Sequence, residues 1–192
     1  MKEIILIGGG GHCKSVIDII ELGGEFHIIG IVDKSKYLGS KLLGYPYIGT
    51  DNDLPELVKV YKYALITIGH IKSSTLRVKL FNLAVKTGFV LPKIISPNAY
   101  VSNHSSVGNG TVVMHNSVVN VNTFIGDNCI INTKALVEHD CTISSHCHIS
   151  TNVTINGGVT VGSGCFIGSC VTVKELSDIN KNSFIKAGSL VI

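Results

Sequence analysis

The second half of the chain repeats an aliphatic residue at every sixth position. From Ile95 to Val191 these positions hold only isoleucine or valine, and the residue two places before each is nearly always small. A period of six matches neither the period of a helix nor the plain alternation of a strand. It is typical of a hexapeptide β-helix, in which short strands wind round a prism and each hexad makes one face. The pattern therefore predicts a β-helix over residues 92–192.

Residues 1–91 show a different pattern, in which short apolar runs alternate with segments of helical periodicity. It predicts strands at residues 2–7, 27–32, 63–68 and 89–91, helices at 13–22, 53–60 and 73–87, and a loop at 34–51. Such an alternation favours a small doubly wound parallel sheet. We therefore expect an α/β Rossmann-like domain over residues 1–91, followed by the β-helix domain over 92–192.

The glycine turn from Gly8 to Gly11, after the first strand, indicates an anion site. Bare backbone N–H groups and a helix N-terminus favour a phosphate at the carboxyl edge of a parallel sheet. The turn is thus interpreted as a nucleotide or nucleotide-sugar site, where Asp33 accepts a hydrogen bond from ribose or base. The alternative is that the glycines only make a tight turn. NAD fits less well, because Cys13 stands where the dinucleotide fingerprint has a third glycine or alanine.

Composition narrows the classes of function. The formal net charge of +3 is small and the basic residues are scattered, which argues against nucleic-acid binding. No apolar run reaches the roughly 18 residues of a membrane span, so we expect a cytoplasmic protein. Four cysteines, Cys129, Cys141, Cys147 and Cys165, fall in the small inward column of the repeat. They are expected to be buried filler rather than metal ligands or disulfides, and no metal is predicted.

The polar residues that interrupt the repeat gather between Asn132 and His148. His139 follows Val137 by two residues, which places it at a corner and turned outward. His148 precedes an inward isoleucine, so it occupies an outward-facing strand position. The alternative for both histidines is a solvated surface side chain without a role.

The geometry of the repeat adds a partner to His139. If three hexads make one coil, Gly157 lies one coil above His139, at about 4.8 Å. A glycine there would leave open space and an approachable N–H beside a base. Acyl transfer needs both, a base for the attacking group and a donor for the oxyanion. Asp140 is placed to orient the imidazole or to raise its basicity.

Several of these motifs together resemble a known family. They are Gly10-Gly11-His12, the strand end at Asp33, Ile68-Gly69 before a helix with Arg77, and Glu138-His139-Asp140-Cys141 with His148 nine residues on. The chain is similar to the hexapeptide-repeat sugar acetyltransferases, which include bacterial UDP-4-amino-sugar N-acetyltransferases and sialic acid O-acetyltransferases. The resemblance implies a Rossmann-like domain, then a left-handed parallel β-helix. It also implies a homotrimer that binds acetyl-CoA between neighbouring β-helices.

The resemblance also implies roles for individual residues. His139 would be the general base and Asp140 its support. The acetyl-CoA contacts would be Asn132, His148, Gly157, Ser169 and Ala187, and the sugar-nucleotide pocket would contain Gly10, Gly11, His12, Asp33 and Gly69. The chain departs from the family's pattern at Lys34, where UDP-sugar enzymes carry a second acidic residue, and at Ala187, where a glycine is usual.

The sequence thus predicts an acetyl-CoA-dependent N-acetyltransferase that acts on a nucleotide-linked amino sugar by direct transfer. O-acetylation of sialic acid or a related sugar is the nearest alternative. A non-catalytic scaffold that binds a nucleotide sugar is an alternative from another class. An acyl-enzyme on Cys141 is disfavoured, because its column points into the prism. The nucleotide and the acceptor sugar stay open.

Overall fold

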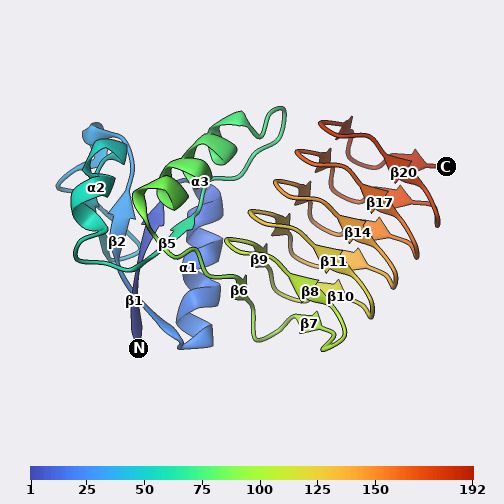
Figure 1. Cartoon of the computed structure of the whole chain (residues 1–192), viewed down its shortest axis with the longest axis horizontal. Helices are drawn as coiled ribbons and strands as arrows, with labels where there is room; N and C mark the ends of the chain where they lie inside the picture. Colours follow the sequence, from blue (N-terminus) through green and yellow to red (C-terminus); the bar gives the residue numbers. More distant parts are fainter. The chain divides into compact units, whose positions relative to one another are not determined.

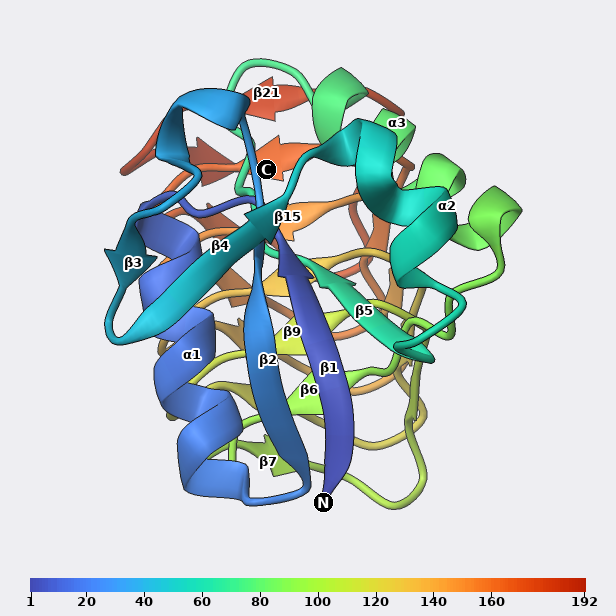
Figure 2. The same cartoon turned by 90° about the vertical axis from the view of Figure 1, so that its left-hand side faces the viewer.

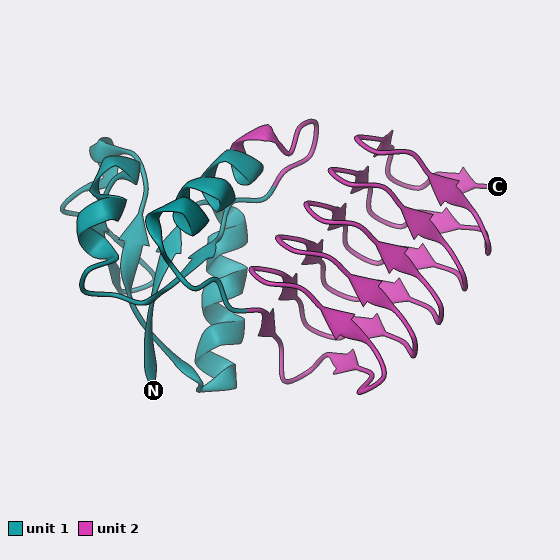
Figure 3. Cartoon of the chain, viewed as in Figure 1, with its two compact units in different colours: residues 1–69, 77–92 teal, residues 70–76, 93–192 magenta.

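The computed structural model describes all residues, 1–192 (Figure 1). They form two compact units, one of residues 1–69 and 77–92 and the other of residues 70–76 and 93–192 (Figure 3). Residues 70–76, which interrupt the first unit in the sequence, therefore belong with the β-helix of residues 93–192. No helix is long and apolar enough to cross a membrane.

The first unit is built on a five-stranded sheet in the order β3-β4-β2-β1-β5 (Figure 2). Its strands are β1 (Lys2–Ile7), β2 (Phe26–Val32), β3 (Lys41–Leu42), β4 (Tyr45–Gly49) and β5 (Tyr63–Ile66). All neighbours pair in parallel except β3 and β4. The prediction of a loop over residues 34–51 was wrong, because Pro46 hides a strand that a sequence pattern demotes. The strand expected at 89–91 is a single bridge between Val90 and Tyr63.

Three α-helices, the last of which has its first two residues in the second unit, and two short 3₁₀ turns accompany this sheet. They are α1 (Gly11–Gly23), α2 (Leu54–Leu57) and α3 (Thr75–Thr87), with 3₁₀ turns at Ser35–Tyr37 and Asp51–Asp53. Leu54 of α2 and Leu80 of α3 join Ile5, Ile7 and Ile66 of the sheet in one apolar cluster. Burial of these aliphatic side chains, about 1.5–3 kcal/mol each, holds the helices against the strands.

The second unit is a parallel β-helix of two-residue strands arranged in three sheets. The β13 sheet contains β7 (Tyr100–Val101), β10 (Val118–Val119), β13 (Leu136–Val137), β16 (Thr154–Ile155), β19 (Thr172–Val173) and β22 (Leu190–Val191). The β14 sheet contains β8 (Ser106–Val107), β11 (Phe124–Ile125), β14 (Thr142–Ile143), β17 (Thr160–Val161) and β20 (Asp178–Ile179). The β15 sheet contains β6 (Ile94–Ile95), β9 (Val112–Val113), β12 (Ile130–Ile131), β15 (His148–Ile149), β18 (Phe166–Ile167) and β21 (Phe184–Ile185).

Each coil contains one strand of every sheet, so residue 130 pairs with 148, and 148 with 166. The sixth-position aliphatics from Val113 to Ile179 are buried and form the core of the prism together with the inward cysteines. The predicted fold class, an α/β domain followed by a hexapeptide β-helix, is confirmed.

A left-handed residue recurs at every corner from Gly110 to Gly188, also with a period of six. Asparagine and glycine fill most of these positions, as expected for a positive φ. Leu176, at φ 60°, is a bulky exception, and its side chain lies over Gly158. The left-handed corners were not predicted from the sequence, although asparagine or glycine recurs there with the same period of six.

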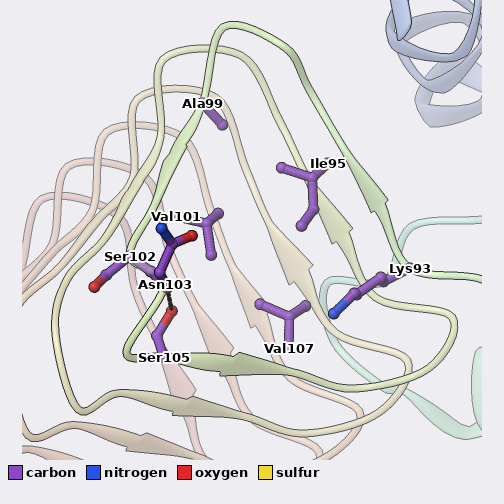
Figure 4. A pocket seen from close by; sticks show the side chains of 8 residues that line it. All are labelled: Lys93, Ile95, Ala99, Val101, Ser102, Asn103, Ser105 and Val107. Atoms are coloured by element: carbon purple, nitrogen blue, oxygen red, sulfur yellow. Dashed lines mark hydrogen bonds between the residues drawn. The ribbon is translucent and has the colours of Figure 1, made fainter. Parts of the chain in front are cut away.

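The first coil leaves the prism open at one end. A cavity of about 420 Å³ lies there, lined by Lys93, Ile95, Ala99, Val101, Ser102, Asn103, Ser105 and Val107 (Figure 4). None of these residues belongs to the predicted site.

Candidate active site

His139 and Asp140 lie in the turn between β13 and β14, a place named here the His139 corner (residues 138–141 and the turns stacked with them, 120–123, 156–159 and 174–177). The imidazole Nδ1 is 2.7 Å from one carboxylate oxygen of Asp140. The other oxygen accepts a hydrogen bond from the side-chain amide of Asn122, at 2.6 Å. The His139 side chain is 58% exposed, and no group of the chain hydrogen-bonds its Nε2.

The electrostatics of the corner keep Asp140 ionised. Donation by Asn122, and then the contact with His139, lowers the pKa of Asp140 below its ordinary value. A charged carboxylate can only accept, so it fixes the proton of a neutral imidazole on Nδ1. Nε2 is thereby left as the basic nitrogen, turned to solvent.

Gly157 lies against the ring of His139. A Cβ at position 157 would stand 2.7 Å from Cε1 and 2.9 Å from Nε2 of the imidazole. The expected open space above His139 is thus filled by the ring itself, and only a glycine admits this packing. The turns are tied together because the Gly158 N–H donates to the His139 carbonyl oxygen, at 2.9 Å. The N–H of Gly157 has no acceptor within the chain.

His148, expected on an outward-facing position, is only 8% exposed. Its Nδ1 lies 2.7 Å from the carbonyl oxygen of His70, and its Nε2 lies 3.1 Å from the amide nitrogen of Asn132. Because a carbonyl only accepts, Nδ1 carries the proton and Nε2 accepts from the amide. Phe166 packs edge-on against the ring. Both nitrogens are therefore used, and residues 70–76 explain the burial that the strand pattern did not foresee.

The other predicted coenzyme residues lie on a different corner from His139. Asn132, Ser169 and Ala187 occupy the turns between the β15 sheet and the β13 sheet. The Ser169 hydroxyl is 3.0 Å from that of Ser150. One face of the prism, the β13 sheet, separates this corner from the base. A single chain therefore brings His139, Asp140 and Gly157 together, but leaves Asn132, Ser169 and Ala187 apart from them.

The predicted nucleotide residues gather at the carboxyl end of the sheet of the first unit. Asp33 accepts from the Gly9 N–H at 2.6 Å and from the Lys34 N–H at 2.7 Å, so it braces the glycine turn. Gly10 and Gly11 begin α1 with open space beside their Cα atoms. A Cβ on Gly69 would lie 3.7 Å from the Cβ of His12.

Tyr47 supports this turn and Arg77 supports the segment before Gly69, and sequence reasoning assigned a role to neither. The buried Arg77 donates from Nη1 to the carbonyl oxygens of Ile66 and Ile68, at 2.8 and 2.6 Å, and so holds the chain just before Gly69. The Tyr47 hydroxyl donates to the Gly9 carbonyl oxygen at 3.3 Å. Tyr47 was missed because it stands in β4, the strand taken for a loop.

The inward cysteines are buried, as expected. Burial raises the pKa of the Cys141 thiol, and a hydrogen bond with Cys129 raises that of Cys147 to about 12. A protonated thiol that points into the prism cannot reach an acyl donor. This position argues against an acyl-enzyme intermediate on Cys141. No group of three or more His, Cys, Asp or Glu side chains is arranged to hold a metal ion.

Comparisons with known proteins agree along the whole chain. The PglD N-terminal domain family matches residues 3–82, and the bacterial transferase hexapeptide family (six repeats) matches residues 140–175. No curated protein matches. Among solved structures, a histidine-to-asparagine variant of perosamine N-acetyltransferase from Caulobacter crescentus, in complex with CoA and GDP-perosamine, is 34% identical. The match covers 100% of this chain and 89% of that chain, with a TM-score of 0.92.

A second similar structure is the acetyltransferase domain of PglB from Neisseria gonorrhoeae FA1090, in complex with acetyl coenzyme A. It is 29% identical, and the match covers 100% of this chain and 91% of that chain, with a TM-score of 0.92. Both proteins therefore share the complete architecture of this chain, and each holds a form of the coenzyme.

Proposed function

The chain belongs to the hexapeptide-repeat sugar acetyltransferases and is an acetyl-CoA-dependent enzyme, and we propose that it N-acetylates a nucleotide-linked amino sugar with His139 as general base. The observation that carries the proposal is the His139 corner. An exposed imidazole is held through Nδ1 by an ionised carboxylate, and its Nε2 stays available. The two similar structures support the substrate class, since one holds GDP-perosamine and CoA and the other acetyl-CoA.

The reaction is a direct acyl transfer. The amine of the acceptor attacks the thioester carbonyl carbon while Nε2 of His139 removes its proton. A C–N bond forms, and the tetrahedral intermediate places its negative oxygen near the Gly157 N–H. The C–S bond then breaks, and the proton on the imidazole passes to the departing thiolate of CoA. Asp140 stabilises the imidazolium between these two steps.

We propose further that the enzyme works as a homotrimer. The coenzyme residues Asn132, Ser169 and Ala187 stand one prism face away from the base. A neighbouring copy brings its own coenzyme corner beside the His139 corner of the first, because closed symmetry pairs unlike faces in a ring. Light scattering of the purified chain is then expected to give about three times 20.4 kDa. A monomer that turns over at full rate would contradict this arrangement.

The test of the reaction is CoA release from acetyl-CoA against UDP-, GDP- and CMP-linked amino sugars and free sialic acid. An amino sugar is expected to be the substrate. His139→Ala is expected to lower turnover by roughly 10²–10⁴-fold. Its affinity for acetyl-CoA, measured by calorimetry, is expected to stay unchanged. Near-normal turnover of the variant would exclude His139 as the base, and acetylation of sialic acid alone would replace N-transfer by O-transfer.

A further inference from the structure

Asn122 stands one coil below Asp140 on the His139 corner. Residues 122 and 140 both adopt the left-handed conformation, with φ of 55° and 61°. The Asn122 amide nitrogen donates to one carboxylate oxygen of Asp140 at 2.6 Å, while the other oxygen contacts His139. Because the carboxylate only accepts, the amide must present its NH₂ group to it. The two side chains therefore act on opposite oxygens of one carboxylate.

The backbone fixes the same two turns to each other. The Asp140 N–H donates to the Val121 carbonyl oxygen at 3.1 Å. The Thr123 hydroxyl donates to the Glu138 carbonyl oxygen at 2.8 Å. Residues on both sides of Asn122 thus hold the coil that carries the base, and the amide needs little further ordering to reach its acceptor.

Contacts of the same kind recur at other corners of the β-helix. Asn128 meets His146 and Asn152 meets Cys170, each 18 residues on and between left-handed positions. These pairs show that a side-chain ladder is a regular feature of the repeat. Only at Asn122 does the ladder end on a carboxylate that itself holds an imidazole. At that position a contact that is regular in the fold acts on the carboxylate that holds the proposed base.

We propose that Asn122 is a positioning residue, which fixes the carboxylate of Asp140 so that it holds the Nδ1–H of His139 and presents Nε2 to the acceptor amine. The proposal rests on the proposed function, in that His139 is the base. Asn122 touches neither substrate nor coenzyme and acts only through Asp140. A carboxylate that is free to rotate would hold the imidazole in the right orientation for a smaller fraction of the time.

A double-mutant cycle on Asn122 and Asp140 tests it. Asn122→Ala frees the carboxylate, so kcat is expected to fall about 10-fold while KM for both substrates stays within about 2-fold, as for an interaction made in the transition state. In an Asp140→Ala background the same substitution is expected to lower kcat no further, because its effect passes through the carboxylate. A merely structural role would lower kcat equally in both backgrounds.

The readouts are kcat and KM for both substrates, measured on the whole protein in the wild-type and Asp140→Ala backgrounds. Asn182→Ala is the matched control, since it removes an exposed asparagine from an equivalent left-handed position on another corner. It is expected to leave both readouts unchanged. If Asn122→Ala leaves kcat unchanged, or lowers it equally in both backgrounds, the proposal is wrong. An inactive His139→Ala beside such a result would refute the role of Asn122 alone, whereas a His139→Ala that retains turnover would refute the assigned base.

Discussion

His139 and His148 belong to the same β-helix, nine residues apart, and their surroundings are opposite. His139 projects from a corner, largely exposed, with one ionised partner and one nitrogen to spare. His148 is buried on a flat face, where a carbonyl oxygen and an amide occupy both of its nitrogens. The same side chain is thus a candidate base at the corner and a packing element on the face. The repeat provides both environments, because residues 70–76 cover the face around His148 while the turn that carries His139 stays exposed.

The largest effect expected from a change outside the His139 side chain concerns the packing of its imidazole. Gly157→Ala places a methyl group against the imidazole of His139, so the ring must move. Turnover is expected to fall about 100-fold, as for a displacement of about 1 Å at a reacting group. CoA release measures it. In a His139→Ala background the same substitution is expected to cost nothing further, because its effect passes through the ring. An equal loss in both backgrounds would contradict this.

The second prediction compares how much each of the two histidines contributes to the free energy of unfolding. His148→Ala leaves the buried His70 carbonyl oxygen and the Asn132 amide without their partner. The free energy of unfolding is expected to fall by about 1–3 kcal/mol. His139→Ala removes only an exposed pair, and a loss below about 0.5 kcal/mol is expected. Urea unfolding of the two variants side by side measures the difference, and equal losses would remove the contrast between corner and face.

A third prediction concerns the upper part of the His139 corner. Leu176 adopts a left-handed conformation and is 79% exposed, so it carries strain without burial in this chain. Leu176→Asn is expected to raise the free energy of unfolding by about 0.5–1 kcal/mol. The mirror-image control is Asn182→Leu, which brings the same strain to an equivalent position and is expected to lower it. A loss of stability in Leu176→Asn would show that the leucine makes a contact worth more than its strain.

The smallest expected effect is the pH dependence of stability at the corner. Hydrogen bonds from Asn122 and His139 depress the pKa of Asp140 in the folded protein. The contribution is therefore present above the unfolded value of about 3.9 and is lost as the pH falls through the folded value. The Tm difference between the wild type and Asp140→Asn is expected to shrink as the pH falls below about 4. A difference that grows on acidification would reverse the sign of the shift.

The sequence predicted the β-helix almost completely, because each sixth-position aliphatic side chain points inward and packs against other residues of the repeat. It also placed His139, Asp140 and Gly157 together, on the assumption of three hexads to a coil, which the strand pairs 18 residues apart confirm. Prediction failed where a distant segment intervenes. The burial of His148 depends on His70, and the bracing of Gly9 depends on Tyr47 in a strand interrupted by proline. Neither contact leaves a periodic trace in the sequence.

Because a coil has 18 residues, the effect of a deletion in the β-helix depends on how many hexads it removes. Removal of one hexad after the site would keep every aliphatic residue inward, and the prism would still close. Each later corner would nevertheless turn by a third of a revolution, and Ser169 and Ala187 would leave the column of Asn132. Removal of three hexads would keep each residue in its own column and would only shorten the β-helix by one coil. The fold should therefore tolerate length changes in steps of six, whereas the proposed active site, which combines residues of several coils, should tolerate them only in steps of 18.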